Sequence, residues 1–161
     1  MKLHHLSKTS YDNSMAEYAT NSKAGFDYEI LETIEAGIVL EGHEVKAIKT
    51  GKASIKGSYV KIYNEEAFLV GATISPYQPA NTPKKYDPQR SRKLLLSRKE
   101  ISKFIGLSQS QGLTLIPLKF YDKKGKIKLL VGIAKGKKKY DKRETIKKKD
   151  IQRLKQRGIE Q

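Results

Sequence analysis

A cluster of cations around one aromatic ring marks the C-terminal part of the chain. It consists of Gly136, Lys137, Lys138, Lys139, Tyr140, Asp141, Lys142 and Arg143. Ammonium and guanidinium groups bind phosphates, and an aromatic ring can stack on an unpaired base. Such a run can also be a solvated tail without a partner, but the tyrosine and the charge of the whole chain favour RNA binding.

The net charge of the chain supports this interpretation. The 161 residues include 33 Lys and Arg against 17 Asp and Glu, which gives a formal net charge of +16. Such an excess attracts a polyanion through counterion release. The chain lacks cysteine, which excludes disulfides, thiolate metal sites and a cysteine nucleophile and agrees with a reducing compartment. We therefore expect a cytoplasmic protein, and because no apolar run is long enough to span a bilayer we expect no membrane partner.

The charge separates a C-terminal tail from the rest of the chain. Residues 135–161 hold 12 basic and 4 acidic side chains, a net charge equal to that of all the preceding residues together. Their apolar content is too sparse to offset the entropy of ordering, so we predict a tail that is disordered when free and folds on binding. Asp141 and Glu144 would suit the first turn of such an induced helix. Residues 1–20 are predicted to be a mobile arm, and residues 21–134 the folded body.

The sequence contains little that indicates a catalytic or metal-binding site. The only imidazoles are His4, His5 and His43, and no glycine-rich phosphate loop is present. A metal-dependent nuclease using Glu35, Glu44 or Asp87 is an alternative, but their spacing supports no metal site. We therefore expect no cofactor, no metal and no enzymatic activity.

Hydrophobic periodicity and turn residues predict the elements of the body. We expect a strand over residues 28–40 broken at Ala36 and Gly37, a helix over 41–49, and a hairpin of residues 58–62 and 67–74. A proline-rich surface loop over 75–91 follows. Ser97 to Glu100 has the form of a capping box, and the helix it opens is expected to end at Gly106. Residues 113–121 and 126–134 are predicted to form a second hairpin.

These elements include too few helices for a parallel sheet with helical crossovers. They fit a small antiparallel β-barrel with flanking helices, similar to the OB fold, which often binds nucleic acid. The expected fold is therefore an OB-like barrel plus the basic C-terminal tail.

Several segments together resemble the SmpB (small protein B) family, over about residues 21–150. They are NSKAGFDY at 21–28, EAGIVL at 35–40, GHEVK at 42–46, RSRKLLL at 90–96, GLTLIPL at 112–118, GIAKGKK at 132–138 and DKR at 141–143. Ser22 and Gly25 stand where many members carry basic residues, and Gly57 where an acidic residue is common. Residues 1–20 align with nothing in the family and inherit no role from it.

The resemblance implies a monomeric adaptor that binds the tRNA-like domain of tmRNA in trans-translation. By similarity, the RNA-binding positions are Asn21, Tyr28, Glu35, Leu95 and Lys138. From the residues alone, an internal salt bridge or simple exposure is the simpler interpretation of Glu35, and a core position is an alternative for Leu95.

The resemblance also implies that the tail, from Gly136 through Tyr140, Asp141, Lys142 and Arg143, enters the decoding centre and the empty mRNA channel of the small ribosomal subunit. Elongation factor Tu with GTP would be an indirect partner through alanyl-tmRNA. The alternative is a general OB-fold RNA-binding or ribosomal protein without preference for tmRNA.

Overall fold

The computed structural model describes residues 16–158, apart from the side chains of residues 139–141. In this part of the chain, a mostly antiparallel sheet is combined with four α-helices. The strands are β1 (Glu17–Thr20), β2 (Tyr28–Ile38), β3 (Ala53–Ser54), β4 (Tyr59–Tyr63), β5 (Glu66–Val70), β6 (Thr73–Ile74), β7 (Arg92–Leu95), β8 (Thr114–Lys123) and β9 (Lys126–Gly136). The helices are α1 (Ala24–Asp27), α2 (Gly42–Lys49), α3 (Arg98–Gln111) and α4 (Lys139–Gln156), with a 3₁₀ turn at Pro79–Asn81.

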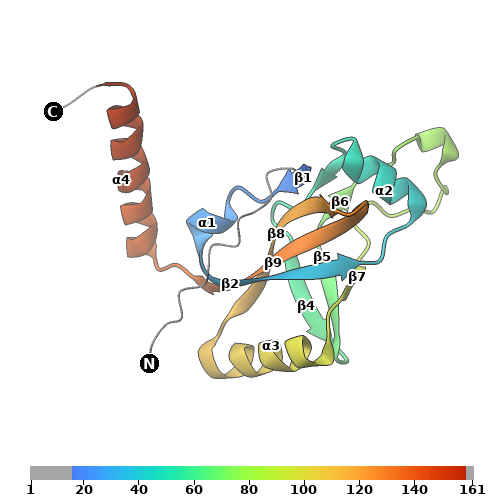
Figure 1. Cartoon of the computed structure of the whole chain (residues 1–161), viewed down its shortest axis with the longest axis horizontal. Coiled ribbons are helices and arrows are strands. Elements are labelled where there is room, and N and C mark those ends of the chain that lie inside the picture. The colour runs from blue at the N-terminus through green and yellow to red at the C-terminus, as the bar shows by residue number, and fades with distance from the viewer. Residues whose placement is uncertain (1–15, 159–161) are drawn as a thin grey trace.

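The strands pair in an order that returns on itself. The main sheet runs β1-β8-β4-β5-β7-β2-β9, and β8 also pairs with β9. The hydrogen-bonded path from β8 through β4, β5, β7, β2 and β9 therefore leads back to β8. The strands β3 and β6 form a separate two-stranded sheet. Figure 1 shows α3 below the strands, α2 above them, and α4 standing to one side of the body.

The core lies on the inner side of the paired strands. Along β9, Leu129, Val131 and Ile133 alternate inward and are almost completely buried. Ala36 of β2 and Phe120 of β8 join them in the same cluster. Because successive side chains of a strand point to opposite faces, the residues between them lie on the outer side. This alternation separates a closely packed interior from an outer surface that is available to a partner.

The helices α2 and α3 both begin at a capping box, and the capping box of α3 was predicted. In α3, the Ser97 side chain accepts from the backbone N–H of Glu100, and the Glu100 carboxylate accepts from the backbone N–H of Ser97. The predicted end at Gly106 is wrong, since α3 continues to Gln111 and ends at Gly112 in the left-handed conformation. Gly106 has no Cβ and leaves open space beside the helix, but one glycine does not stop a helix that packs on a core.

The two predicted hairpins are present, but the strand expected over residues 67–74 is wrong in its extent, since β5 ends at Val70 and Thr73–Ile74 pair with β3 in the other sheet. The strands β4 and β5 pair with Tyr63 opposite Glu66, and β8 and β9 pair with Lys123 opposite Lys126. Each hairpin closes through two residues with positive φ, Asn64 and Glu65 in the first and Lys124 and Gly125 in the second. Two-residue turns of this kind match the right-handed twist of the strands, which sets the register of both hairpins.

The predictions for the N-terminal part need two corrections. The irregularity of β2 was expected at Ala36 and Gly37, but the register with β9 shifts between Ile30 and Glu32, so that Leu31 is the extra residue. The expected mobile arm includes residues 17–20, yet these form β1 and pair with β8. Residues 1–15 of that arm lie outside the described residues.

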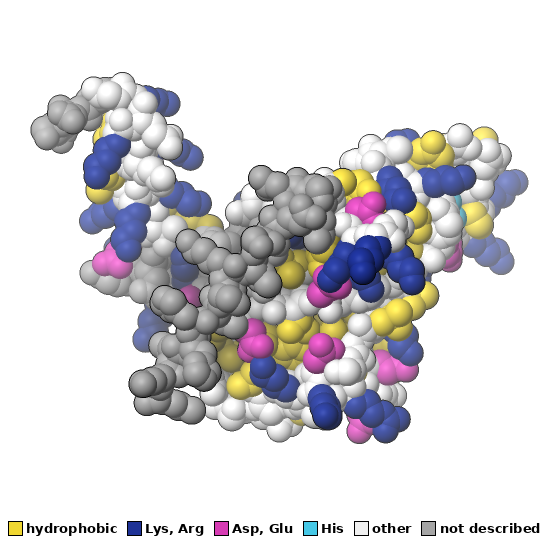
Figure 2. Space-filling model, viewed as in Figure 1, with side chains coloured by type: hydrophobic (Ala, Val, Ile, Leu, Met, Phe, Trp, Pro, Cys, Tyr) yellow, Lys and Arg dark blue, Asp and Glu magenta, His cyan; other side chains and the backbone are white. Residues whose placement is uncertain are grey.

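The basic tail is helical in the structure. Its helix α4 exposes Ile146, Ile151 and Leu154, each at 41–54%, and Figure 2 shows Lys and Arg side chains along its whole length. The prediction that the tail lacks structure when free concerns the unbound protein in solution and stays a prediction.

An isolated peptide of residues 135–161 is expected to show little helix in buffer. Short, mostly charged helices do not overcome the cost of nucleation without tertiary contacts. Circular dichroism measures this directly, and the same peptide in trifluoroethanol provides the helical reference. A stable helix in buffer would contradict folding upon binding.

Candidate nucleic-acid interface

The bulge at Leu31 brings separate parts of β2 to one surface. Tyr28 and Glu35 are seven residues apart and would lie on opposite faces of a regular strand. Because Leu31 is inserted between the paired positions, Tyr28 opposes Gly136 and Glu35 opposes Leu130, six residues apart along the regular strand β9. Tyr28 and Glu35 therefore share the outer face of the sheet. Two of the predicted RNA-binding residues are aligned by this single insertion.

Asn21 and Tyr28 meet in a groove of about 530 Å³ at the start of this face. The Asn21 side chain donates to the carbonyl oxygen of Pro117 at 3.1 Å, which fixes its position against β8. Lys23 and Lys56 supply cations to the same groove, which is lined by Asn21, Lys23, Ala24, Asp27, Tyr28, Lys56, Gly57, Ser58, Tyr59, Thr114 and Ile116. The groove can offer a phosphate two ammonium groups, and it can offer a base the rings of Tyr28 and Tyr59.

Glu35 belongs to a polar cluster on the outer face. Its carboxylate accepts from the hydroxyl of Tyr121 and from the Nζ of Lys123, the latter at 3.1 Å from both oxygens. Desolvation of Glu35 raises its pKa, but the hydrogen bonds from Tyr121 and Lys123 outweigh this effect and hold the pKa below its ordinary value. The internal salt bridge considered for Glu35 is therefore present, and the Glu35 side chain is 34% exposed at the surface.

Leu95 is on the surface, and the interpretation of Leu95 as a core residue is wrong. Its side chain is 56% exposed at the end of β7, where it pairs directly with Gly37. A Cβ added at Gly37 would come within 3.1 Å of the Leu95 Cβ. Glycine at this position therefore lets Leu95 lie across β2 on the same face as Glu35. An exposed apolar side chain can pack against a ribose or a base edge.

The predicted tail residues lie at the junction of β9 and α4. Gly136 ends β9 opposite Tyr28, and Lys138 is exposed directly before α4 begins. Lys142 and Arg143 follow in the first turns of α4. The side chains of Tyr140 and Asp141 lie outside the described residues, so their predicted roles rest on the sequence.

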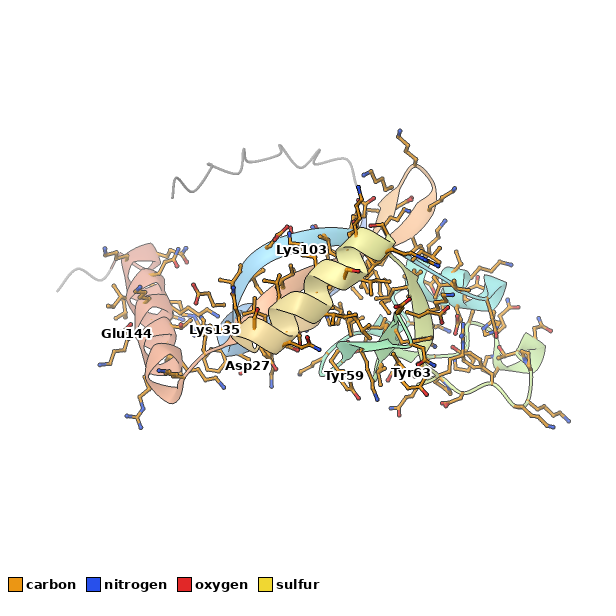
Figure 3. The ribbon with its side chains drawn as sticks, turned by 90° about the horizontal axis from the view of Figure 1, so that it is seen from below. Asp27, Tyr59, Tyr63, Lys103, Lys135 and Glu144 are labelled. Carbon is orange, nitrogen blue, oxygen red and sulfur yellow. The ribbon has the colours of Figure 1, made fainter. Side chains whose placement is uncertain are left out.

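Polar contacts attach the base of α4 to α1. The Nζ of Lys137 donates to the carbonyl oxygen of Gly25 at 2.9 Å and to the hydroxyl of Thr145 at 3.0 Å. Lys142 lies 3.3 Å from a carboxylate oxygen of Asp27. Figure 3 labels Asp27 and Lys135 on the side of the body near α4, and the backbone N–H of Lys137 donates to the Asp27 carbonyl oxygen at 3.0 Å. Because α1 also borders the groove of Asn21 and Tyr28, the tail begins beside the candidate site.

A buried ionic cluster holds the proline-rich loop, and sequence reasoning missed it. Glu44 of α2 and Arg92 of β7 are both fully buried, with 2.9 Å between their charged groups. Arg90 adds a second pair to Glu44 at 2.6 Å, and the hydroxyl of Tyr86 lies 3.0 Å from the same carboxylate. These contacts fasten residues 86–92 to α2. The only local signal is an unusual pair of arginines before an apolar strand.

The same cluster bears on the alternative of a metal-dependent nuclease. Both oxygens of Glu44 are engaged by arginines, and those of Glu35 by Tyr121 and Lys123. Within residues 16–158, no group of three or more His, Cys, Asp or Glu side chains is placed to hold a metal ion.

None of the helices described is long and apolar enough to cross a membrane.

An antiparallel sheet with a polar groove on its outer face, followed by a strongly cationic helix, defines a class of small basic β-sheet proteins suited to a structured polyanion. Comparison with known proteins gives the family. The family model described as SmpB protein matches residues 18–161. The chain belongs to the SmpB family.

Curated relatives support this assignment over most of their length. An SsrA-binding protein of Anoxybacillus flavithermus is 54% identical over 141 residues, which cover 88% of this chain and 91% of the relative. One from Acetivibrio thermocellus is 57% identical over 135 residues, covering 84% and 87%. A chain in a solved structure described as "tmRNA-SmpB: a journey to the center of the bacterial ribosome" matches with a TM-score of 0.62 and 43% identity, covering 77% of this chain and 87% of the other.

Proposed function

We propose that this chain is the tmRNA-binding adaptor of trans-translation. The observation that carries the proposal is its membership of the SmpB family over residues 18–161, together with relatives named SsrA-binding protein. The body binds the tRNA-like domain of tmRNA and delivers it to stalled ribosomes. The C-terminal tail inspects the decoding centre and the empty mRNA channel of the small subunit. Alanyl-tmRNA then supplies the template for the tag, with elongation factor Tu and GTP as indirect partners.

The body and the tail differ in charge and in fold, and we assign a separate role to each. We assign residues 21–134 to an OB-like barrel, which the return of the strand pairings to β8 supports. We assign residues 135–161 to a tail that acts on the ribosome, since its cations project beyond the sheet on α4. Residues 17–20 join the body through β1. The protein acts as a monomer in the cytoplasm, and it positions RNA without making or breaking a bond.

The outer face of β2 is the proposed surface for the tRNA-like domain. Tyr28, Glu35 and Leu95 lie on it, Asn21 borders it, and Lys138 lies where the sheet meets the tail. Tyr28 offers an aromatic face, Glu35 an acceptor for base amino groups, and Leu95 an apolar contact. Lys138 supplies a cation for the phosphate backbone.

The test is a comparison of two RNAs of equal length. Binding of the tRNA-like domain of tmRNA and of an elongator tRNA is measured by fluorescence anisotropy at about 0.15 M salt, where loose phosphate contacts are weakened. We expect tighter binding of the tRNA-like domain by about 100-fold or more, within the range that separates specific from non-specific binding. Equal affinities would instead favour a general OB-fold RNA-binding or ribosomal protein.

Glu35→Ala is expected to weaken binding of the tRNA-like domain about tenfold, because one base contact contributes roughly 1–3 kcal/mol. The matched control is Glu32→Ala, which removes the same charge from β2, where Glu32 pairs with exposed Lys103. Both variants become more cationic by the same amount, so non-specific attraction rises equally. Equal affinities of the two variants for the tRNA-like domain would rule out a specific role for Glu35.

A further inference from the structure

The outer face of β4 carries a strip of aromatic and basic side chains that meets the proposed tmRNA surface only at Tyr59. Tyr59, Lys61 and Tyr63 alternate along β4 with Val60 and Ile62, which turn toward the interior. The Tyr59 side chain is 48% exposed and that of Tyr63 is 62% exposed. Figure 3 labels Tyr59 and Tyr63 at separate positions along this strand. We call Tyr59, Lys61 and Tyr63 the β4 strip.

The polar groups of the β4 strip are unused by the described part of the protein. The hydroxyls of Tyr59 and Tyr63 form no hydrogen bond with any residue of the described chain, and Lys61 forms no ion pair there. Four lysines of the described body form ion pairs, among them Lys93 with Glu66 at 2.7 Å and Lys103 with Glu32 at 2.8 Å, but Lys61 does not. Lys61 therefore presents an uncompensated cation between two exposed rings.

The neighbouring strand extends the strip. Phe68 of β5 lies directly opposite Lys61 and is half-buried, so a third ring is placed between the two tyrosines. Glu66, opposite Tyr63, is the carboxylate on this face, and Lys93 neutralises it. The strip thus combines aromatic faces with a net positive charge.

The spacing of the two tyrosines suits an extended strand of nucleotides. A strand rises about 3.3 Å per residue, so Tyr59 and Tyr63 are separated by roughly 13 Å along β4. Unpaired bases stack on aromatic side chains, and cations between the rings contact the connecting phosphates. A duplex keeps its bases stacked on each other and cannot present their faces to the rings. An apolar protein partner would leave the Lys61 charge uncompensated.

We propose that the β4 strip is a second RNA site, which binds an unpaired segment by stacking bases on Tyr59 and Tyr63 with Lys61 on the intervening phosphate. This site differs in ligand from the outer face of β2, which we assign to a folded RNA domain. Tyr59 also lines the groove of Asn21 and Tyr28. Tyr63 is outside that groove and is therefore the residue that distinguishes the two sites.

The test uses the full chain, labelled octauridylate as an unstructured single strand, and a short RNA duplex as its paired counterpart. Tyr63→Ala is expected to weaken octauridylate binding about tenfold at 0.15 M salt, since each stacked base contributes substantially to single-strand affinity. Tyr63→Phe keeps the ring and should bind within about twofold of the natural chain. The affinity for the duplex should be the same in all three proteins.

A second variant tests the cation independently. Lys61→Gln should reduce the salt dependence of octauridylate binding by about 0.7 in slope, the value for one phosphate contact on a single strand. Lys99→Gln removes one exposed cation from α3 and should leave the slope unchanged. Equal octauridylate affinity of Tyr63→Ala and the natural chain would overturn the proposal, as would an equal loss of single-strand and duplex binding. Neither result depends on the preference for the tRNA-like domain, so the two proposals can fail separately.

Discussion

Deletion of residues 141–161 is expected to abolish peptide tagging on stalled ribosomes and to keep the preference for the tRNA-like domain of tmRNA. This is the largest functional effect that we expect, because the deletion removes most of α4 and leaves every strand of the sheet in place. The deleted segment holds eight basic and four acidic side chains. Overall RNA affinity should fall with this charge, but the ratio between the two RNAs should stay within about threefold, since cations bind both backbones alike. Tagging in a reconstituted translation reaction and RNA anisotropy measure the two activities.

A single substitution can interrupt the helix of the tail without changing the charge of the tail. Ile146→Pro keeps every cation of α4 but interrupts the helix at a cost of about 3 kcal/mol or more. We expect it to lose most of the tagging activity, while Ile146→Ala, which favours a helix, keeps it. Tagging at the natural level by Ile146→Pro would contradict a helical tail on the ribosome. Equal loss of tagging and of RNA preference in the deletion would contradict the division between body and tail.

Glu44→Gln is expected to lower the free energy of unfolding by about 3–5 kcal/mol. The substitution leaves Arg92 fully buried without its charge partner, and such an unpaired charge is strongly destabilising. The loop of residues 86–92 would also lose its attachment to α2. Urea unfolding measures the change. Glu66→Gln, which breaks the exposed pair with Lys93, should cost less than about 1 kcal/mol.

The same cluster makes stability depend on acid pH. Desolvation of Glu44 raises its pKa, but hydrogen bonds from Arg90, from the backbone N–H of Glu41 and from Arg92 outweigh it and hold the pKa at about 2, against an ordinary value of 4.5. A carboxylate with a lowered pKa stabilises the fold above its unfolded pKa, and this stabilisation is lost as the pH falls toward the folded value. The natural chain should therefore lose stability between about pH 4.5 and 2, and Glu44→Gln should lack this component. Identical acid profiles of the two proteins would show that Glu44 does not titrate with folding.

The resemblance to the SmpB family, the charge of the tail and the local elements could be read from the sequence. Hairpin turns such as residues 122–125 and the capping box at Ser97 are signals that act within a few residues. The excess of cations after residue 134 is likewise visible without a structure. These features predicted the two hairpins, the helix α3 and an RNA partner, and they need no knowledge of distant contacts.

The sequence alone could not predict which side chains lie together on the surface. The bulge at Leu31, which aligns Tyr28 with Glu35, is set by the register between β2 and β9, and these strands are about one hundred residues apart in the chain. The pairing of β1 with β8 and the contact between Glu44 and Arg92 also join distant segments.

Composition and local periodicity thus determined which elements form and that the chain attracts a polyanion. Only the tertiary structure decided which side chains share a face. The register between two paired strands depends on how both strands bury their apolar faces in the same core, so it is decided only when the whole domain packs.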